Sequence, residues 1–347
     1  MRIRFLTSTP LDIVRGSGTY VGMQVLARAL RQLGHEVDFA PHGRHLPNYT
    51  LERLLFNRAL RPSDHDLTVG FDMDGYRIAG GRAHVAALKG VIADEARFES
   101  GMTRLTMSIQ ARCERQHVRR AARVIATSRY SAECAQEFYG LRDTPAVVPE
   151  LIDRAEWRKL LHDHPATADR FTVLYVGRMY RRKRVNILLR AAEILRARIP
   201  DLELRLVGNG PCAEAWRRSA PHAIWLGDVS RAQLASEYNR ASVFCLPSVQ
   251  EGFGIVLLEA MAAGKPIVAS RAAAIPEVAL HASLVEPENP EALAAALEHL
   301  HRSDSARREN ALAGIRCVEQ FDAGRVARLF LDAALDLQPS QATYTAN

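Results

Sequence analysis

The chain has 347 residues, of which 48% are hydrophobic and 24% are charged, enough for about two globular domains with a large core. Its formal net charge of +7 rests on 42 Arg and only 4 Lys and suits an anionic ligand or surface. Because zinc-type spacings, RNA-binding aromatic motifs and long basic runs are missing from the sequence, nucleic acid is not an expected partner. Five scattered cysteines, a charged first segment and no long apolar run predict a cytoplasmic protein without a spanning helix.

Short apolar runs alternate with longer amphipathic segments along the first half of the chain. The expected strands are 3–6, 37–40, 67–70, 88–93, 124–127 and 146–148, and the expected helices are 20–33, 51–60, 102–122 and 131–139. The polar segment 157–170 is predicted to be a linker.

The alternation resumes after this segment. Strands are expected at 171–176, 202–207, 224–226, 243–246 and 267–269, and helices at 185–198, 212–219, 231–240, 254–263, 290–300, 306–320 and 323–335. Such alternation is typical of parallel sheets with helices on both faces. The sequence therefore predicts an α/β chain of two doubly wound parallel-sheet domains, 1–160 and 161–320, with a disordered tail over 338–347.

The most informative segment is 247–266, which follows an expected strand. Glu251 and Glu259 lie eight residues apart and bracket a helix start at Gly254. A helix N-terminus suits a phosphate, and eight helical residues span about 12 Å, the reach from a sugar to a ribose through a diphosphate. One glutamate would then bind sugar hydroxyls and the other ribose hydroxyls. The alternative is an ordinary strand–loop–helix unit with two solvated glutamates.

A basic cluster, Arg178 to Arg184, follows the expected strand 171–176. Arg binds a diphosphate through forked hydrogen bonds and Lys as a point charge, and Lys183 stands out in an Arg-rich chain. Cations at a helix start oppose the helix dipole, so several of them there favour a bound anion. The alternative is a solvated basic turn.

Three weaker signals follow other strands. Gly16 and Gly18 allow backbone to approach a phosphate or sugar, or form a flexible loop. Gly208 and Asn209 precede a helix start and bind the nucleotide or simply turn the chain. Asp94 and Glu95 contact an acceptor hydroxyl or, as we slightly favour, cap the next segment.

The segment 51–61 mixes arginines with large apolar residues. It either rests on an anionic membrane, which suits a lipid-linked acceptor, or, as we favour, packs on a sheet with its arginines in solvent. Peripheral contact with the inner face of a membrane therefore stays an open alternative.

Together these motifs resemble glycosyltransferase family 4, the retaining transferases of the GT-B fold. The resemblance is strongest over 173–300 and rests on the following elements in the family's order: Gly177-Arg178 with Lys183, Leu206–Pro211, Leu226-Gly227, Pro247-Ser248, Glu251–Gly254 with Glu259-Ala260, and Ala263–Pro266. It implies two facing domains, with a C-terminal helix over 321–337 returning to the first. It also implies transfer of a hexosyl group from a nucleoside-diphosphate sugar to a glycan or lipid-linked hydroxyl, as in polysaccharide biosynthesis.

The resemblance also implies roles for individual residues. Arg178 and Lys183 would hold the diphosphate as catalytic groups, Glu251 the transferred sugar and Glu259 the ribose. The N–H groups of Phe253, Gly254 and Ile255 would bind sugar and phosphate, and Gly16 and Gly18 would cap the diphosphate. Similar proteins usually need no catalytic metal, so neither a cofactor nor a metal is expected.

The sequence departs from the family's pattern at two places, and two other functions are compatible with its motifs. Many family members have a His near the end of the fourth strand, where we place Ala93-Asp94-Glu95, and glycines at the position of Ala272–Ala274. A non-catalytic protein that binds a nucleotide sugar, and a retaining sugar phosphorylase or synthase, are compatible with the same motifs.

Overall fold

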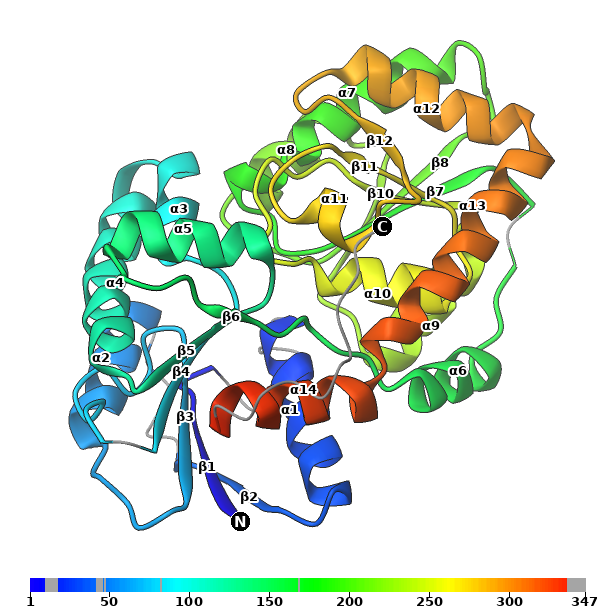
Figure 1. Ribbon diagram of the computed structural model, residues 1–347. Helices are drawn as coiled ribbons and strands as arrows, with labels where there is room; N and C mark the ends of the chain where they lie inside the picture. Colours follow the sequence, from blue (N-terminus) through cyan, green and yellow to red (C-terminus); the bar gives the residue numbers. More distant parts are fainter. Residues whose placement is uncertain (10–17, 42–45, 47, 82, 168, 336–347) are drawn as a thin grey trace. The chain divides into compact units, whose positions relative to one another are not determined.

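A computed structural model of the chain describes residues 1–9, 18–41, 46, 48–81, 83–167 and 169–335. These residues form two compact units (Figure 1). Unit 1 consists of Met1–Leu151 and the segment that begins at Ala323, and unit 2 of Ile152–Asp322.

Unit 1 is built on a parallel sheet with the strand order β2-β1-β3-β4-β5-β6 within the described residues. Its strands are β1 Arg2–Leu6, β2 Glu36–Phe39, β3 Leu67–Phe71, β4 His84–Leu88, β5 Arg123–Ala126 and β6 Ala146–Val147. Its helices are α1 Gly18–Gln32, α2 Tyr49–Ala59, α3 Ile92–Glu95, α4 Gly101–Arg120, α5 Arg129–Tyr139 and α14 Ala323–Leu335, with a 3-10 turn at Ala96–Phe98. Ala87 packs in the core with α1 and α14, whereas Ala86 and Leu88 pack with α4 and α5, so helices cover both faces.

Unit 2 repeats this plan with the order β12-β11-β10-β7-β8-β9 among the described residues. Its strands are β7 Thr172–Val176, β8 Glu203–Val207, β9 Ile224–Gly227, β10 Val243–Leu246, β11 Ile267–Ser270 and β12 Ser283–Val285. Its helices are α6 Arg154–Asp163, α7 Val185–Arg196, α8 Ala213–Ser219, α9 Arg231–Arg240, α10 Ile255–Ala262, α11 Ile275–Val278, α12 Pro290–Arg302 and α13 Asp304–Cys317, with 3-10 turns η2 Arg181–Lys183 and η3 Val318–Phe321. Figure 1 shows α7 and α12 on one side of the strands and α9 and α10 on the other. The predicted fold class is confirmed in both units.

The prediction of a strand over 88–93 is wrong. The strand β4 is His84–Leu88, and it pairs with β3 and β5 over that range. Lys89 and Gly90 interrupt the apolar run, and the chain after them is helical in α3. The residue at the end of this strand is therefore Lys89. The sequence reading also missed β12 and α11, which are only three and four residues long.

The prediction of a linker over 157–170 is also wrong, because the first half of this segment belongs to helix α6. Asp153 caps this helix by accepting a hydrogen bond of 2.9 Å from the N–H of Glu156. Trp157 is 2% exposed, packs edge-on against Tyr238 at 5.5 Å and donates from Nε1 to the carbonyl of Glu259. The helix looks polar in the sequence because Trp157 is its one fully buried residue among those described.

Replacing this side chain tests whether α6 is part of the core of unit 2. We expect Trp157→Ala to lower the free energy of unfolding by about 3–5 kcal/mol, because it leaves a cavity between α6 and α9. Urea-induced unfolding followed by circular dichroism measures the change. Arg158→Ala on the exposed face is the control, with an expected change within about 0.5 kcal/mol. Equal effects of the two substitutions would contradict the packing described.

Candidate active site

The loops after β7 and β8 are in backbone contact at the carboxyl edge of the unit 2 sheet. The N–H of Met179 donates to the carbonyl of Asn209 at 2.9 Å. Gly208 has a φ of +114°, and a Cβ atom there would lie 2.1 Å from the carbonyl oxygen of Gly177. A Cβ atom at Gly210 would lie 2.7 Å from the nitrogen of Met179. Only glycine fits at both positions, so these glycines bring the two loops together.

The helix α10 starts beside these loops, because β10 is the neighbour of β7 in the sheet. Gly254 occupies the N-cap position with a φ of +90°, and among the described residues no side chain caps this end of the helix. The backbone N–H groups of the first turn therefore present the positive end of the helix dipole without a capping side chain. Phe253 is buried against Phe321 and anchors the turn.

A buried ion pair connects the loops after β7 and β10. The ammonium of Lys183 lies 2.6 Å from Oε1 of Glu251, and their side chains are only 13% and 9% exposed. The hydroxyl of Ser248 donates to the same carboxylate oxygen at 2.8 Å, and the N–H of Val249 donates to the carbonyl of Arg182. The cation predicted to hold the diphosphate and the carboxylate predicted to hold the sugar thus contact each other directly.

The other arginines of the basic cluster have different surroundings. Arg178 is exposed, and no hydrogen bond or ion pair of its side chain with another described residue is found. Arg182 is buried with its guanidinium 4.7 Å from the centre of the Tyr180 ring, and Arg184 pairs with Glu288 at 2.7 Å. Arg178 therefore has its side chain in solvent, whereas the ammonium of Lys183 is already paired with Glu251.

Glu259 lies on α10, and its carboxylate accepts a hydrogen bond of 3.0 Å from the hydroxyl of Tyr238. Burial raises the pKa of Glu259 to about 7, and the Tyr238 hydrogen bond and Arg231 offset this only in part. The carboxylate therefore exists in both protonation states near neutral pH.

The loop after β11 contains the alanines that replace glycines of the resembling family. Ala273 has a φ of +51°, which an L-residue rarely adopts, and the N–H of Ala274 donates to the carbonyl of Glu251. Glycine adopts such a backbone conformation without strain, whereas Ala273 adopts it at some cost in energy.

Among the candidate residues of unit 1, Asp94 and Glu95 are placed differently from the expectation. Gly16 lies outside the described residues, and Gly18 is the first residue of α1. Asp94 is completely buried in α3, where its carboxylate accepts hydrogen bonds from the hydroxyl of Tyr130 and from Arg97. Glu95 follows it in α3, with its carboxylate close to Gly90. Neither residue directly follows a strand, because β4 ends earlier.

Sequence reasoning missed a group of charged residues at the carboxyl ends of the unit 1 strands. Arg53 is buried and bonds to Asp74 at 3.4 Å, and Asp72 lies 4.0 Å from the same guanidinium. Lys89 pairs with Glu150 at 3.0 Å. The scarcity of lysine was a usable signal for Lys89, whereas Arg53 is one of 42 arginines. Among the described residues, no group of three or more His, Cys, Asp or Glu is placed to hold a metal ion.

Two helix-covered parallel sheets, one with a glycine-lined strand edge, are the architecture of GT-B glycosyltransferases. A family model described as "Glycosyl transferases group 1" matches residues 170–303. The chain is 31% identical over 339 residues to a phosphatidyl-myo-inositol mannosyltransferase of Mycolicibacterium smegmatis, covering 88% of this chain and 86% of the relative. The chain therefore belongs to the group 1 glycosyltransferases, the family 4 that its motifs resemble, and is a transferase enzyme.

Solved structures agree on the fold. Sucrose-phosphate synthase from Thermosynechococcus elongatus superposes with a TM-score of 0.78 at 21% identity, covering 97% of this chain and 99% of that chain. HepE of Anabaena, in complex with UDP and glucose, superposes with a TM-score of 0.68 at 18% identity, covering 97% and 100%.

Proposed function

We propose that the protein transfers a sugar from a nucleoside-diphosphate sugar to an acceptor hydroxyl of a glycan or lipid-linked molecule, with retention of the anomeric configuration. The observation that carries the proposal is the Lys183–Glu251 pair, which lies beside a helix N-terminus that no side chain in the described part of the chain caps. In support, one relative is named as a mannosyltransferase, and one structural neighbour is solved with UDP and glucose.

The proposed roles follow from charge and position. The exposed guanidinium of Arg178 and the ammonium of Lys183 bind the diphosphate, assisted by the N–H groups of Phe253, Gly254 and Ile255. As Lys183 turns to the diphosphate, Glu251 accepts hydrogen bonds from the sugar. Glu259 accepts hydrogen bonds from the ribose, and the loop of Gly208 and Asn209 lies under the nucleotide.

In the reaction, the bond between the anomeric carbon and the diphosphate oxygen breaks, and a bond from the same carbon to the acceptor oxygen forms. The acceptor attacks from the face of the leaving group, and its proton passes to the departing diphosphate. Arg178 and Lys183 stabilise the charge that develops on that diphosphate, so no side-chain nucleophile takes part. The two cations supply the positive charge, and the proposal assigns no role to a metal or cofactor.

Removing either cation tests this assignment. We expect Arg178→Ala and Lys183→Ala each to lower kcat by about 10²–10³-fold, as for the loss of one preorganised electrostatic contact. Sugar transfer from a radiolabelled nucleotide sugar measures the effect. Arg190→Ala, at an exposed position of α7, is the control and should retain full activity. Near-normal kcat in both site variants would overturn the assignment.

The raised pKa of Glu259 gives a second test. Ribose hydroxyls donate to the ionised carboxylate, so protonation below the pKa of about 7 removes acceptor capacity and weakens nucleotide binding. We expect affinity for a nucleoside diphosphate to fall as the pH drops from 8 to 6 by more than the titration of the phosphates explains. Isothermal titration calorimetry measures this, and Glu259→Gln gives the phosphate contribution alone. Parallel pH profiles of the two proteins would contradict the role of Glu259.

We also propose that unit 1 contacts an anionic membrane, where a lipid-linked acceptor resides. Leu51 and Leu55 on α2 are 47% and 48% exposed, and Met102 and Leu105 on α4 are 72% and 56% exposed. The two helices pack against each other and also carry exposed arginines. Arg53 of α2 takes no part, since it points into the buried group around Asp74. No described helix is long and apolar enough to cross a bilayer.

Flotation with vesicles of phosphatidylglycerol and phosphatidylcholine tests this contact. We expect the protein to float with the vesicles and the double variant Leu55→Glu with Leu105→Glu to stay in the soluble fraction, because it removes apolar area and adds negative charge. Leu312→Glu, at an equally exposed leucine of unit 2, is the control. An equal loss in the control, or no flotation of the unchanged protein, would contradict the proposal.

A further inference from the structure

A second buried lysine–glutamate pair lies at the carboxyl edge of the unit 1 sheet. Lys89 directly follows β4, and Glu150 lies three residues beyond β6. The ammonium is 3.0 Å from each carboxylate oxygen, and the two side chains are 10% and 6% exposed. Ligands of open parallel sheets bind beyond the carboxyl ends of the strands, so this pair lies where a substrate of unit 1 is expected.

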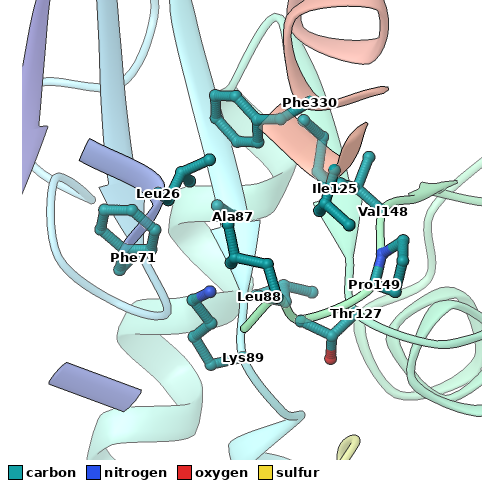
Figure 2. A pocket seen from close by; sticks show the side chains of 12 residues that line it. Leu26, Phe71, Ala87, Leu88, Lys89, Ile125, Thr127, Val148, Pro149 and Phe330 are labelled. Carbon is teal, nitrogen blue, oxygen red and sulfur yellow. The ribbon is translucent and has the colours of Figure 1, made fainter. Parts of the chain in front are cut away.

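Lys89, one member of the pair, borders a small hollow, shown in Figure 2. Its walls are largely apolar and include Phe71, Leu88 and Pro149, while Lys89 and Thr127 contribute polar atoms. Figure 2 shows the nitrogen of Lys89 turned toward the interior, and it lies 5.5 Å from the centre of the Phe71 ring. The hollow has room for about one water-sized group, which is also the size of a hydroxyl.

Neighbouring backbone holds both members of the pair in place. A Cβ atom at Gly22 would lie 2.6 Å from Oε2 of Glu150, so the carboxylate packs directly on α1. The N–H of Lys89 donates to Oδ1 of Asp72 at 2.8 Å. Asp72 itself has a φ of +53°, a strained conformation of the kind that concentrates at functional sites.

We infer that Lys89 and Glu150 position the acceptor by binding a hydroxyl of an uncharged cyclic polyol, an inference that rests on the proposed function. A hydroxyl both donates and accepts a hydrogen bond. The ammonium has three donors and the carboxylate only acceptors, so the pair serves both needs of one hydroxyl. Leu88 and Pro149 contribute apolar wall to the hollow that Lys89 borders.

The local charge favours a neutral group over a phosphate. Glu150 already neutralises Lys89, and Asp72 lies next to it with an 18% exposed side chain. Burial raises the pKa of Asp72 to about 6, against the pull of Arg53, so this carboxylate is mostly ionised at pH 7.5. A phosphate at Lys89 would therefore face two carboxylates, and their repulsion opposes its binding.

Binding measurements at pH 7.5 on the full chain, saturated with a nucleoside diphosphate, test the inference. The probes are myo-inositol and myo-inositol 1-phosphate, followed by saturation-transfer NMR. Lys89→Met alone leaves a buried carboxylate without its partner and is expected to destabilise the protein. The double variant Lys89→Met with Glu150→Gln removes both charges and restores stability, and Lys159→Met on exposed α6 is the matched control.

We expect the unchanged protein and the control to bind myo-inositol, and the double variant to bind it about 10- to 100-fold more weakly, as for lost hydrogen bonds to charged groups. The nucleoside diphosphate should bind all three proteins equally. A stable double variant with unchanged polyol affinity would show the pair to be structural and overturn the inference. Absence of polyol binding by the unchanged protein, or tighter binding of the phosphate that depends on Lys89, would overturn it too. If the proposed function itself is wrong, the unchanged protein will not bind the nucleoside diphosphate, and this result is distinct from the outcomes above.

Discussion

The contact between Lys183 and Glu251 ties together the parts of the unit 2 site. Removing two charges from water costs several kcal/mol per ion, and their attraction offsets this cost only with good geometry. Here Ser248 supplies an additional hydrogen bond, and the backbone contact of Val249 with Arg182 fixes the spacing of the two loops. A pair of this kind contributes little net stability. In the proposed function, the pair holds a cation and an anion side by side for a ligand that carries both phosphate and hydroxyl groups.

The geometry of the unit 2 site also depends on the apolar packing of helix α10. Helix α10 is apolar on most of its surface and buries Leu257, Leu258 and Met261. This burial sets the direction of its N-terminus and the position of Glu259. Tyr238 and Trp157 close the other side of Glu259 through a hydroxyl and an indole N–H. The same enclosure keeps water away from the carboxyl group and raises its pKa, so core packing and site chemistry have one cause.

The sequence predicted the alternating strands and helices. It failed where contacts between residues far apart in the chain set an element's boundaries or a side chain's partner. The alternation of apolar runs identified both sheets, and the spacing of Lys183, Glu251 and Glu259 identified the candidate donor site. The strand β4 was misplaced because apolar residues resume after Lys89-Gly90, and only pairing with β3 and β5 sets its boundaries. Helix α6 was missed because its single buried anchor, Trp157, packs on Tyr238, which lies 81 residues later. The partner of Lys89 is 61 residues away and carries no local signal.

The two units share a feature in the placement of lysine. Arginine outnumbers lysine by 42 to 4, yet each unit has one lysine at a strand edge in a buried pair with a glutamate. Arginine presents a rigid planar fork that matches one carboxylate or phosphate, and a buried fork does not turn easily to a new partner. The lysine ammonium is compact, carries three donors on a flexible stem, and adds a hydroxyl or a phosphate oxygen without leaving its place. In the roles that we propose, lysine therefore stands where a buried charge must exchange or share its partner, whereas the buried Arg53 lies between Asp72 and Asp74.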